Sequence, residues 1–361
     1  MRKIAVVLIL LLLFAVGCNQ TENQEDPASE SETTAVEEET TEPDSEDASL
    51  ADTKEDSEEA TEDTDTTQAP VRIAGMKGAT SMGMAMLLDQ AEKGEAGQAY
   101  ETAVYTAADD IMPRLLQGEL DIAALPVNAA SILWNKSSGG IQVIAVNTLG
   151  VLEVLEKGDQ IASLADLEGQ TVYMTGQGTV PEYSLRALME QAGVSFDNVQ
   201  IEWKSEPTEI TTLLATEDEA ICVLPQPFAT VALQKVEGLE KKLDFTDLWD
   251  ETMDAGQFVT GVFVARTEFV ESQEEAVRLF LSDYQKSVEE VKASPAPAAE
   301  VIGELGIVDA ALAEKAIPAM HLVSLQGEEM QQAVEGFLGA LHETNPESVG
   351  GNLPDETFYF K

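Results

Sequence analysis

Short apolar runs alternate with helix-like stretches from Val71 to the end of the chain. The first run, Val71–Gly75, precedes a loop of small and polar residues at Met76–Gly83, and apolar residues then recur at helical spacing to Leu88. The pattern predicts a strand, a loop and a helix. Such loops, at the carboxyl end of a strand, are where open α/β sheets bind ligands, although most of them bind nothing.

The alternation continues through the rest of the chain. Because strands and helices alternate, the pattern predicts parallel sheets with crossover helices, and from Glu268 onward it is mostly helical. The predicted strands are Ala103–Tyr105, Leu120–Leu125, Ile141–Val146, Thr171–Met174, Val199–Trp203, Ala220–Leu224 and Phe258–Ala265, and the predicted helices include Ala108–Leu116, Ser163–Gly169, Pro181–Ala192 and Pro207–Ala215.

The first 18 residues predict a targeting signal. Arg2 and Lys3 precede the apolar run Ile4–Phe14, which is too short to span a membrane comfortably. Small residues then lead to Cys18, an arrangement that resembles the bacterial lipobox, in which the cysteine is lipid-modified. Ala15 stands where that motif usually has leucine, and the alternative is an ordinary signal peptide with an incidental cysteine.

Residues 19–70 are rich in Glu, Asp, Thr and Ser and contain one basic residue, Lys54. A segment with so few apolar side chains cannot form a core, so we expect a disordered acidic tether. The whole chain of 361 residues carries a formal net charge of −47. That charge argues against binding to nucleic acid, which basic surface favours, and against docking on anionic lipid headgroups.

Catalytic, metal and cofactor signatures are weak. The Gly176–Gly178 run fails as a dinucleotide fingerprint because Pro181 occupies the third glycine position. The two histidines, His321 and His342, lie away from every small-residue loop, and Cys222 within an apolar strand indicates a buried structural thiol. The sequence therefore predicts no catalytic residue, no metal site and no cofactor.

Four loops stand out because each follows an apolar strand and opens a helix with small or amide-bearing residues. Two come from each half of the α/β region, which indicates a cleft between two domains. Core packing is the alternative for the aromatic residues near them. The loops are Met76–Met82, Pro126–Ala130, Gly176–Tyr183 and Pro225–Phe228.

From about Val71 to Lys361 the chain resembles the solute-binding proteins of bacterial ABC importers, in the nitrate/sulfonate/taurine and NMT1/THI5-like group. The resemblance rests on KGATSMG at Lys77–Gly83, GELDIAALPVNAAS at Gly118–Ser131, NTLG at Asn147–Gly150, SLADLEGQTVYMTGQGTVPEYSL at Ser163–Leu185, LPQPF at Leu224–Phe228 and VTGVFVAR at Val259–Arg266.

The resemblance implies the type II periplasmic-binding-protein fold, an α/β architecture of two lobes, each a mostly parallel sheet flanked by helices, joined by two hinge crossings. Lobe one would be residues 71–150 and 260–361, and lobe two residues 151–259, with crossings near Gly150–Val154 and Gln257–Gly261. It implies ligand contacts at Lys77, Gly78, Ala79, Thr80, Ser81, Met82, Pro126 and Asn128 in lobe one and at Gly176, Gln177, Gly178, Thr179, Glu182, Tyr183, Gln226 and Phe228 in lobe two.

The expected function is capture of a small polar solute on the extracytoplasmic face of a bacterial membrane, by a lipid-anchored monomer that serves an ABC permease and its ATPase. The alternatives are an enzyme on the same fold, of the pyrimidine or menaquinone pathway type, and a sensory surface lipoprotein. The solute class stays open between a sulfonate- or nitrate-like anion and a pyrimidine-like heterocycle. Lys77 is the only basic residue among the expected contacts, and helix N-termini could also hold an anion.

Overall fold

The computed structural model describes residues 69–361. The predicted signal peptide, Cys18 and nearly all of the predicted tether lie outside the described residues. Within residues 69–361, no helix has the length and apolar content needed to cross a membrane.

The first sheet has six strands in the order β11-β4-β10-β3-β1-β2. β1 pairs in parallel with β2 and β3, whereas β10 is antiparallel to both β3 and β4, and β11 is antiparallel to β4. Its strands are β1 (Val71–Met76), β2 (Tyr100–Tyr105), β3 (Ile122–Pro126), β4 (Ile141–Leu149), β10 (Val259–Arg266) and β11 (Leu322–Leu325).

The second sheet has five strands in the order β7-β6-β8-β5-β9. β6 is parallel to β7 and β8, and β5 is antiparallel to β8 and β9. Its strands are β5 (Leu152–Lys157), β6 (Thr171–Met174), β7 (Gln200–Trp203), β8 (Ala220–Pro225) and β9 (Leu239–Asp244).

Both sheets are mixed, although most strands of each point the same way, as predicted: β1, β2, β3 and β4 in the first sheet and β6, β7, β8 and β9 in the second. The strands that run the other way are β5, β10 and β11. For β5 and β10 the reason lies in how the chain passes between the sheets. The chain crosses from the first sheet to the second through residues 150–151, which we call the first passage, between the end of β4 and the start of β5. β5 therefore starts at the edge of the second sheet that faces the first, where β8 ends, and it runs opposite to β8. β10 returns to the first sheet in the same way and runs opposite to β3.

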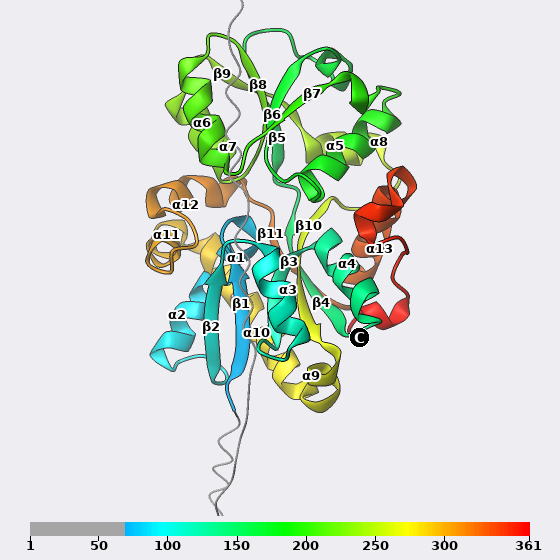
Figure 1. Cartoon of the computed structure of the whole chain (residues 1–361). Coiled ribbons are helices and arrows are strands. Elements are labelled where there is room, and N and C mark those ends of the chain that lie inside the picture. The colour runs from blue at the N-terminus through cyan, green and yellow to red at the C-terminus, as the bar shows by residue number, and fades with distance from the viewer. Residues whose placement is uncertain (1–68) are drawn as a thin grey trace, which may run out of the picture. The chain divides into compact units, whose positions relative to one another are not determined.

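Helices cover both sheets (Figure 1). The helices predicted from the sequence at 108–116, 181–192 and 207–215 are present to within one residue at either end, and Pro181 and Pro207 lie in the first turn of their helices, where the missing N–H is no loss. The α-helices are α1 (Ala79–Met82), α2 (Ala85–Lys93), α3 (Ala108–Leu116), α4 (Val127–Ser137), α5 (Val180–Gln191), α6 (Pro207–Thr216), α7 (Phe228–Lys235), α8 (Phe245–Thr252), α9 (Thr267–Ser272), α10 (Glu274–Ala293), α11 (Pro295–Glu304), α12 (Ala310–Ala316) and α13 (Gly327–Thr344). The 3₁₀ turns are η1 (Leu164–Leu167), η2 (Phe196–Asn198), η3 (Ile317–Ala319), η4 (Pro346–Val349) and η5 (Glu356–Phe358).

An aromatic cluster packs around the return passage, residues 253–258, which leads from α8 back to β10 of the first sheet. Trp249 of α8 lies 5.3 Å from Phe258 and 4.9 Å from Phe337 of α13, measured between ring centroids, and Phe245 packs on Phe258. The four side chains are almost completely buried in one apolar cluster. Phe258 of the return passage therefore packs between α8, which lies against the second sheet, and α13, which lies against the first.

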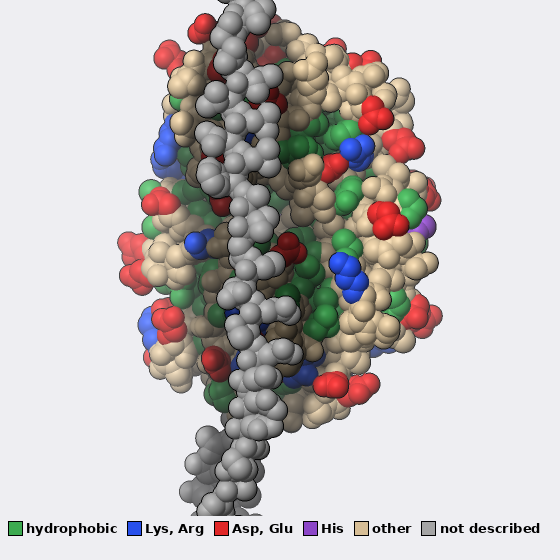
Figure 2. All heavy atoms as spheres, viewed as in Figure 1, with side chains coloured by type: hydrophobic (Ala, Val, Ile, Leu, Met, Phe, Trp, Pro, Cys, Tyr) green, Lys and Arg blue, Asp and Glu red, His purple; other side chains and the backbone are tan. Residues whose placement is uncertain are grey.

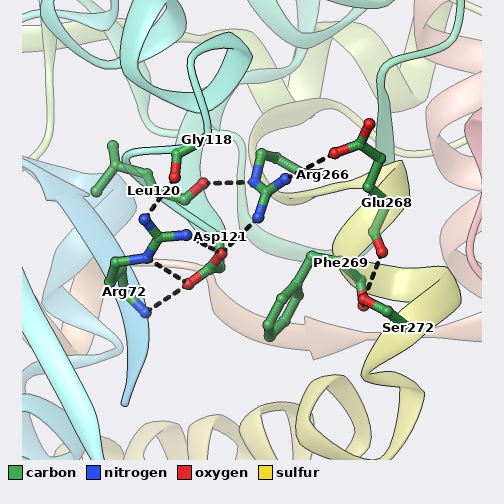
Figure 3. Close-up of polar contacts among 8 residues, drawn as sticks. All are labelled: Arg72, Gly118, Leu120, Asp121, Arg266, Glu268, Phe269 and Ser272. Atoms are coloured by element: carbon green, nitrogen blue, oxygen red, sulfur yellow. Dashed lines mark hydrogen bonds and ion pairs between the residues drawn. The ribbon is translucent and has the colours of Figure 1, made fainter. Parts of the chain in front are cut away.

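Asp121 joins three strands at the end of the first sheet away from the passages (Figure 3). Its buried carboxylate accepts hydrogen bonds from the Arg72 guanidinium at 2.6 and 2.9 Å and from the Arg266 guanidinium at 2.8 Å, and Arg72 also donates to the carbonyl of Gly118. Burial opposes ionisation of Asp121, but the hydrogen bonds from both arginines outweigh it and hold the pKa of this carboxyl below its ordinary value.

We expect Asp121→Asn to lower the free energy of unfolding at pH 7 by about 1–2 kcal/mol, less than for a fully buried pair because both arginines reach solvent. A depressed pKa in the folded state stabilises it above the ordinary aspartate pKa of about 3.9, and this contribution is lost as pH falls through the folded pKa. Denaturation curves of wild type and variant should therefore converge in acid. Glu268→Gln is the control, because Glu268 is 90% exposed beside Arg266. An equal loss of unfolding free energy in Asp121→Asn and Glu268→Gln would contradict the stabilising role of the Asp121 carboxylate.

Candidate functional site

The predicted ligand loops lie at the ends of strands beside the two passages. Lys77–Met82 runs from the end of β1 through α1, and Pro126 ends β3, with Asn128 in the first turn of α4. In the other sheet, Gly176–Thr179 joins β6 to α5, and Gln226 joins β8 to α7. In Figure 1 α1 and α4 lie at the end of the first sheet nearest the second, and α5 and α7 at the end of the second nearest the first.

The loop after β1 is tightly closed. The Ser81 hydroxyl accepts a hydrogen bond from the Met76 N–H at 2.6 Å, and the Lys77 N–H donates to the carbonyl of Tyr105 at 2.9 Å. Gly78 has φ 106°, a conformation that L-side chains rarely adopt. The loop thus presents an exposed Lys77 and a half-buried Gly78 and Ala79, while Ser81 is buried.

Several side chains at this edge carry buried polar atoms for which the described chain offers no hydrogen-bond partner. Among them are the hydroxyls of Thr80, Thr148 and Thr260 and both amide atoms of Asn147, although Thr260 as a residue is only partly buried. Thr80 and Asn147 meet over Gly261 of β10, because a Cβ placed on Gly261 would lie 2.6 Å from Thr80 Cγ2 and 2.5 Å from Asn147 Oδ1. Buried polar groups in proteins are almost always paired, so this cluster is the strongest candidate for solute contact at the edge.

Asn147 and Thr260 were not among the predicted ligand residues. Asn147 lies near the end of β4 and Thr260 near the start of β10, and Asn147 opens the NTLG motif that carried the resemblance. That placement was the available signal. The strand pairing that places Gly261 beside Thr148, and so beside Asn147, is a tertiary fact.

Two predicted contacts in the first lobe have other roles. Met82 has no exposed surface and packs in the apolar core beneath the sheet, so its side chain is not available to a solute. Asn128 is also buried, and its amide N–H donates to the carbonyl of Ser348 at 3.3 Å, which holds η4 against α4. Of the two amide atoms of Asn128, the nitrogen is therefore paired and the oxygen has no partner within residues 69–361.

The loop after β6 is folded on itself. Glu182 accepts a hydrogen bond from the Gly178 N–H at 2.8 Å and pairs with Arg186 at 3.0 Å, and the Thr179 hydroxyl donates to the carbonyl of Gly176. Gln177 and Gly178 are exposed. Burial, reinforced by the charge of Glu182, raises the pKa of the half-buried Tyr183. This loop offers a solute backbone N–H groups and the Tyr183 ring rather than a free carboxylate.

Gln226, after β8, is buried and immobilised by hydrogen bonds. Its amide N–H donates to Glu153 Oε1 at 3.1 Å, and its amide oxygen accepts from the hydroxyl and N–H of Thr230. Phe228 lines a groove of about 740 Å³ between α6, α7 and α12. Gln226 and Phe228 are thus two residues apart at the start of α7, but the Gln226 side chain is buried against Glu153 and Thr230, whereas Phe228 lines the groove.

Acidic side chains are spread over the surface that Figure 2 shows. They lie over the margins of both lobes, with apolar side chains gathered between them on the visible face.

Within residues 69–361, no cluster of His, Cys, Asp and Glu could hold a metal ion. Cys222 is a buried free thiol whose pKa burial raises, as the sequence predicted.

Residues 139–298 match the family model described as NMT1/THI5 like. The predicted resemblance to the NMT1/THI5-like group is confirmed. A Brucella abortus (strain 2308) protein described as a "putative binding protein" is 25% identical over 281 residues, which cover 75% of this chain and 83% of the relative.

Solved structures share the fold of this chain. An ABC transporter from Parabacteroides distasonis superposes with a TM-score of 0.67 at 23% identity, covering 81% of this chain and 99% of the other. The periplasmic aliphatic sulphonate binding protein SsuA from Escherichia coli superposes with a TM-score of 0.63 at 15% identity, covering 81% and 92%. The predicted two-lobed α/β periplasmic-binding-protein fold is therefore confirmed.

Proposed function

We propose that this protein is an extracytoplasmic solute-binding protein that delivers a small polar solute to an ABC importer. The observation that carries the proposal is the cluster of buried, unpartnered polar groups at Thr80, Asn147 and Thr260, at the sheet edge beside the passages. A solute lying there would supply the missing hydrogen bonds, and each one to a buried group contributes about 1–3 kcal/mol.

Lobe two closes the proposed site from the other side. Residues 71–150 with 260–361 form one lobe and residues 151–259 the other, and the solute is held between their facing loops. The predicted contacts that remain in the proposal are Lys77, Gly78, Ala79, Thr80, Ser81, Pro126, Asn128, Gly176, Gln177, Gly178, Thr179, Glu182, Tyr183, Gln226 and Phe228, to which Asn147 and Thr260 are added. Closure is favoured because the solute binds the closed form more tightly than the open one.

The partners in this proposal are an ABC permease and its ATPase, which take the solute from the closed protein. Residues 1–18 direct export, lipid attached at Cys18 holds a monomer at the membrane, and residues 19–70 form a tether between anchor and lobes. We propose binding without turnover, because both histidines lie outside the loops that surround the site.

Mass spectrometry of the full-length protein purified from bacterial membranes tests both parts of the proposal. Under native conditions we expect a bound small molecule, released unchanged when the protein is denatured. Under denaturing conditions we expect a mature chain that begins at Cys18 and carries the mass of attached acyl chains. A chain with an unmodified Cys18 would contradict the anchor alone. Absence of any bound solute, together with no thermal stabilisation by a panel of small polar solutes, would contradict the binding function.

A further inference from the structure

Glu153 is a buried carboxylate at the edge of the second sheet that faces the first. It is the second residue of β5, and its neighbour Leu152 pairs with Pro225 at the end of β8, directly before the Gln226 loop. Glu153 is 8% exposed, and its Oε2 atom has no hydrogen-bond partner within residues 69–361. A buried carboxylate with a free oxygen is costly unless something pairs with it.

The groups around Glu153 do not balance its charge. Gln226 donates to Oε1, but its own oxygen is occupied by Thr230, so the amide cannot turn to serve Oε2. Lys241 Nζ lies 3.8 Å from Oε1, is 46% exposed, and is closer to Asp244, at 3.1 Å. Burial is the main cause of a raised pKa at Glu153, and the nearby charge of Asp244 adds to it.

Glu156, on the same strand, shows what a structural carboxylate looks like in this lobe. It is 1% exposed, and its two oxygens accept backbone N–H groups from Gln160 at 2.7 Å and Ile161 at 3.1 Å, with Lys242 3.8 Å away. Both oxygens are therefore used within the fold. The free oxygen of Glu153 is a property of its position and is not shared by the other buried carboxylate of β5.

We propose that Glu153 selects the solute by accepting a hydrogen bond from it through Oε2, so that the protein takes a neutral or cationic nitrogen compound with N–H donors and rejects anions. The inference rests on the proposed solute-binding function and narrows its solute class to amines, amidines or amino-heterocycles. An anion at the same site would meet a buried negative charge of like sign, and Lys77, the only basic residue among the predicted contacts, is exposed to solvent.

Glu153→Gln and the matched control Glu156→Gln test the proposal in the full-length protein. The probes for calorimetry are cytosine, 4-aminopyridine and benzamidine as donors, and ethanesulfonate and nitrate as anions. We expect at least one donor probe to bind wild type, Glu153→Gln to weaken it at least tenfold with little loss of melting temperature, and Glu156→Gln to lower the melting temperature with affinity unchanged. Binding of either anion in preference to the donors, or equal donor affinity in wild type and Glu153→Gln, would overturn the inference and leave the solute-binding function intact.

The sign of the pH dependence gives an independent readout. A donor solute stabilises the ionised carboxylate, so its affinity should fall as pH drops toward and through the pKa of Glu153, which lies above the ordinary glutamate value of about 4.3. An anionic solute would bind better on acidification. The other groups facing Glu153 are Gln226, Lys241 and Asp244, which are unchanged in the variant, so Glu153→Gln should flatten the profile.

If none of the five probes binds, the molecule found in the native mass spectrum decides the question. A species with N–H donors that is lost in Glu153→Gln but kept in Glu156→Gln supports the inference. A sulfonate, nitrate or other species without N–H donors overturns it. Failure to bind any small molecule defeats the proposed function and this inference with it, an outcome distinct from binding of an anion.

Discussion

Replacement of Gly261 by alanine is expected to weaken the affinity of the proposed site for its solute about a hundredfold. The new Cβ would lie 2.5 Å from Asn147 Oδ1 and 2.6 Å from Thr80 Cγ2, so both side chains must move. These side chains carry two of the unpartnered groups proposed to hold the solute. Displacing two such hydrogen bonds corresponds to about 3 kcal/mol, or roughly a hundredfold in affinity. Calorimetry with a solute that binds wild type, or the bound fraction in a native mass spectrum, measures the effect.

Gly339→Ala is the control for Gly261→Ala. Gly339 lies in α13, and a Cβ placed there meets no atom of the described chain within 4 Å. Its affinity for the solute should equal that of wild type. Gly261→Ala should also remain folded, because the crowded atoms at Asn147 and Thr80 belong to side chains that can rotate. A folded Gly261→Ala variant with wild-type affinity would show that the solute lies elsewhere.

Gly336→Ala is expected to destabilise the fold strongly, although alanine favours helices. Gly336 lies one turn before Gly339 in α13, and its Cβ would lie 2.1 Å from the carbonyl oxygen of Ala255 in the return passage. This oxygen belongs to the backbone, so relief requires α13 and the passage to separate. Trp249 holds the same segment from its other side by donating to the carbonyl of Gly256 at 3.1 Å.

The two glycines of α13 therefore make a matched pair. We expect Gly336→Ala to lose about 1–3 kcal/mol through overpacking and Gly339→Ala to gain about 0.5–1 kcal/mol through helix propensity. Differential scanning calorimetry of the two variants should show melting temperatures shifted in opposite directions from wild type. Equal shifts would mean that α13 does not press against the passage as the structure describes.

Local sequence signals predicted most helices and strands because their causes are local. Apolar periodicity, the prolines that begin α5 and α6, and the Ser163–Asp166 capping box of η1 all lie within the elements they define. Strands β5, β9 and β11 were not predicted, and β11 lies in the region that was expected to be mostly helical. Glu153 and Glu156 interrupt the apolar pattern of β5, and Lys241 and Lys242 interrupt that of β9.

Short stretches of sequence were enough to predict the α/β class, the resemblance to the NMT1/THI5-like group and the loops at which a solute site was expected. That the sheets are mixed could be seen only in the folded chain, because the direction of β5 and β10 follows from the connections between the two sheets. The folded chain also distinguished the side chains within the predicted loops. Burial removes Met82 from the surface, and partners far apart in sequence occupy the Asn128 amide and leave Asn147 and Glu153 with free polar atoms. Pairing and burial depend on residues up to 220 positions apart, which no local pattern records.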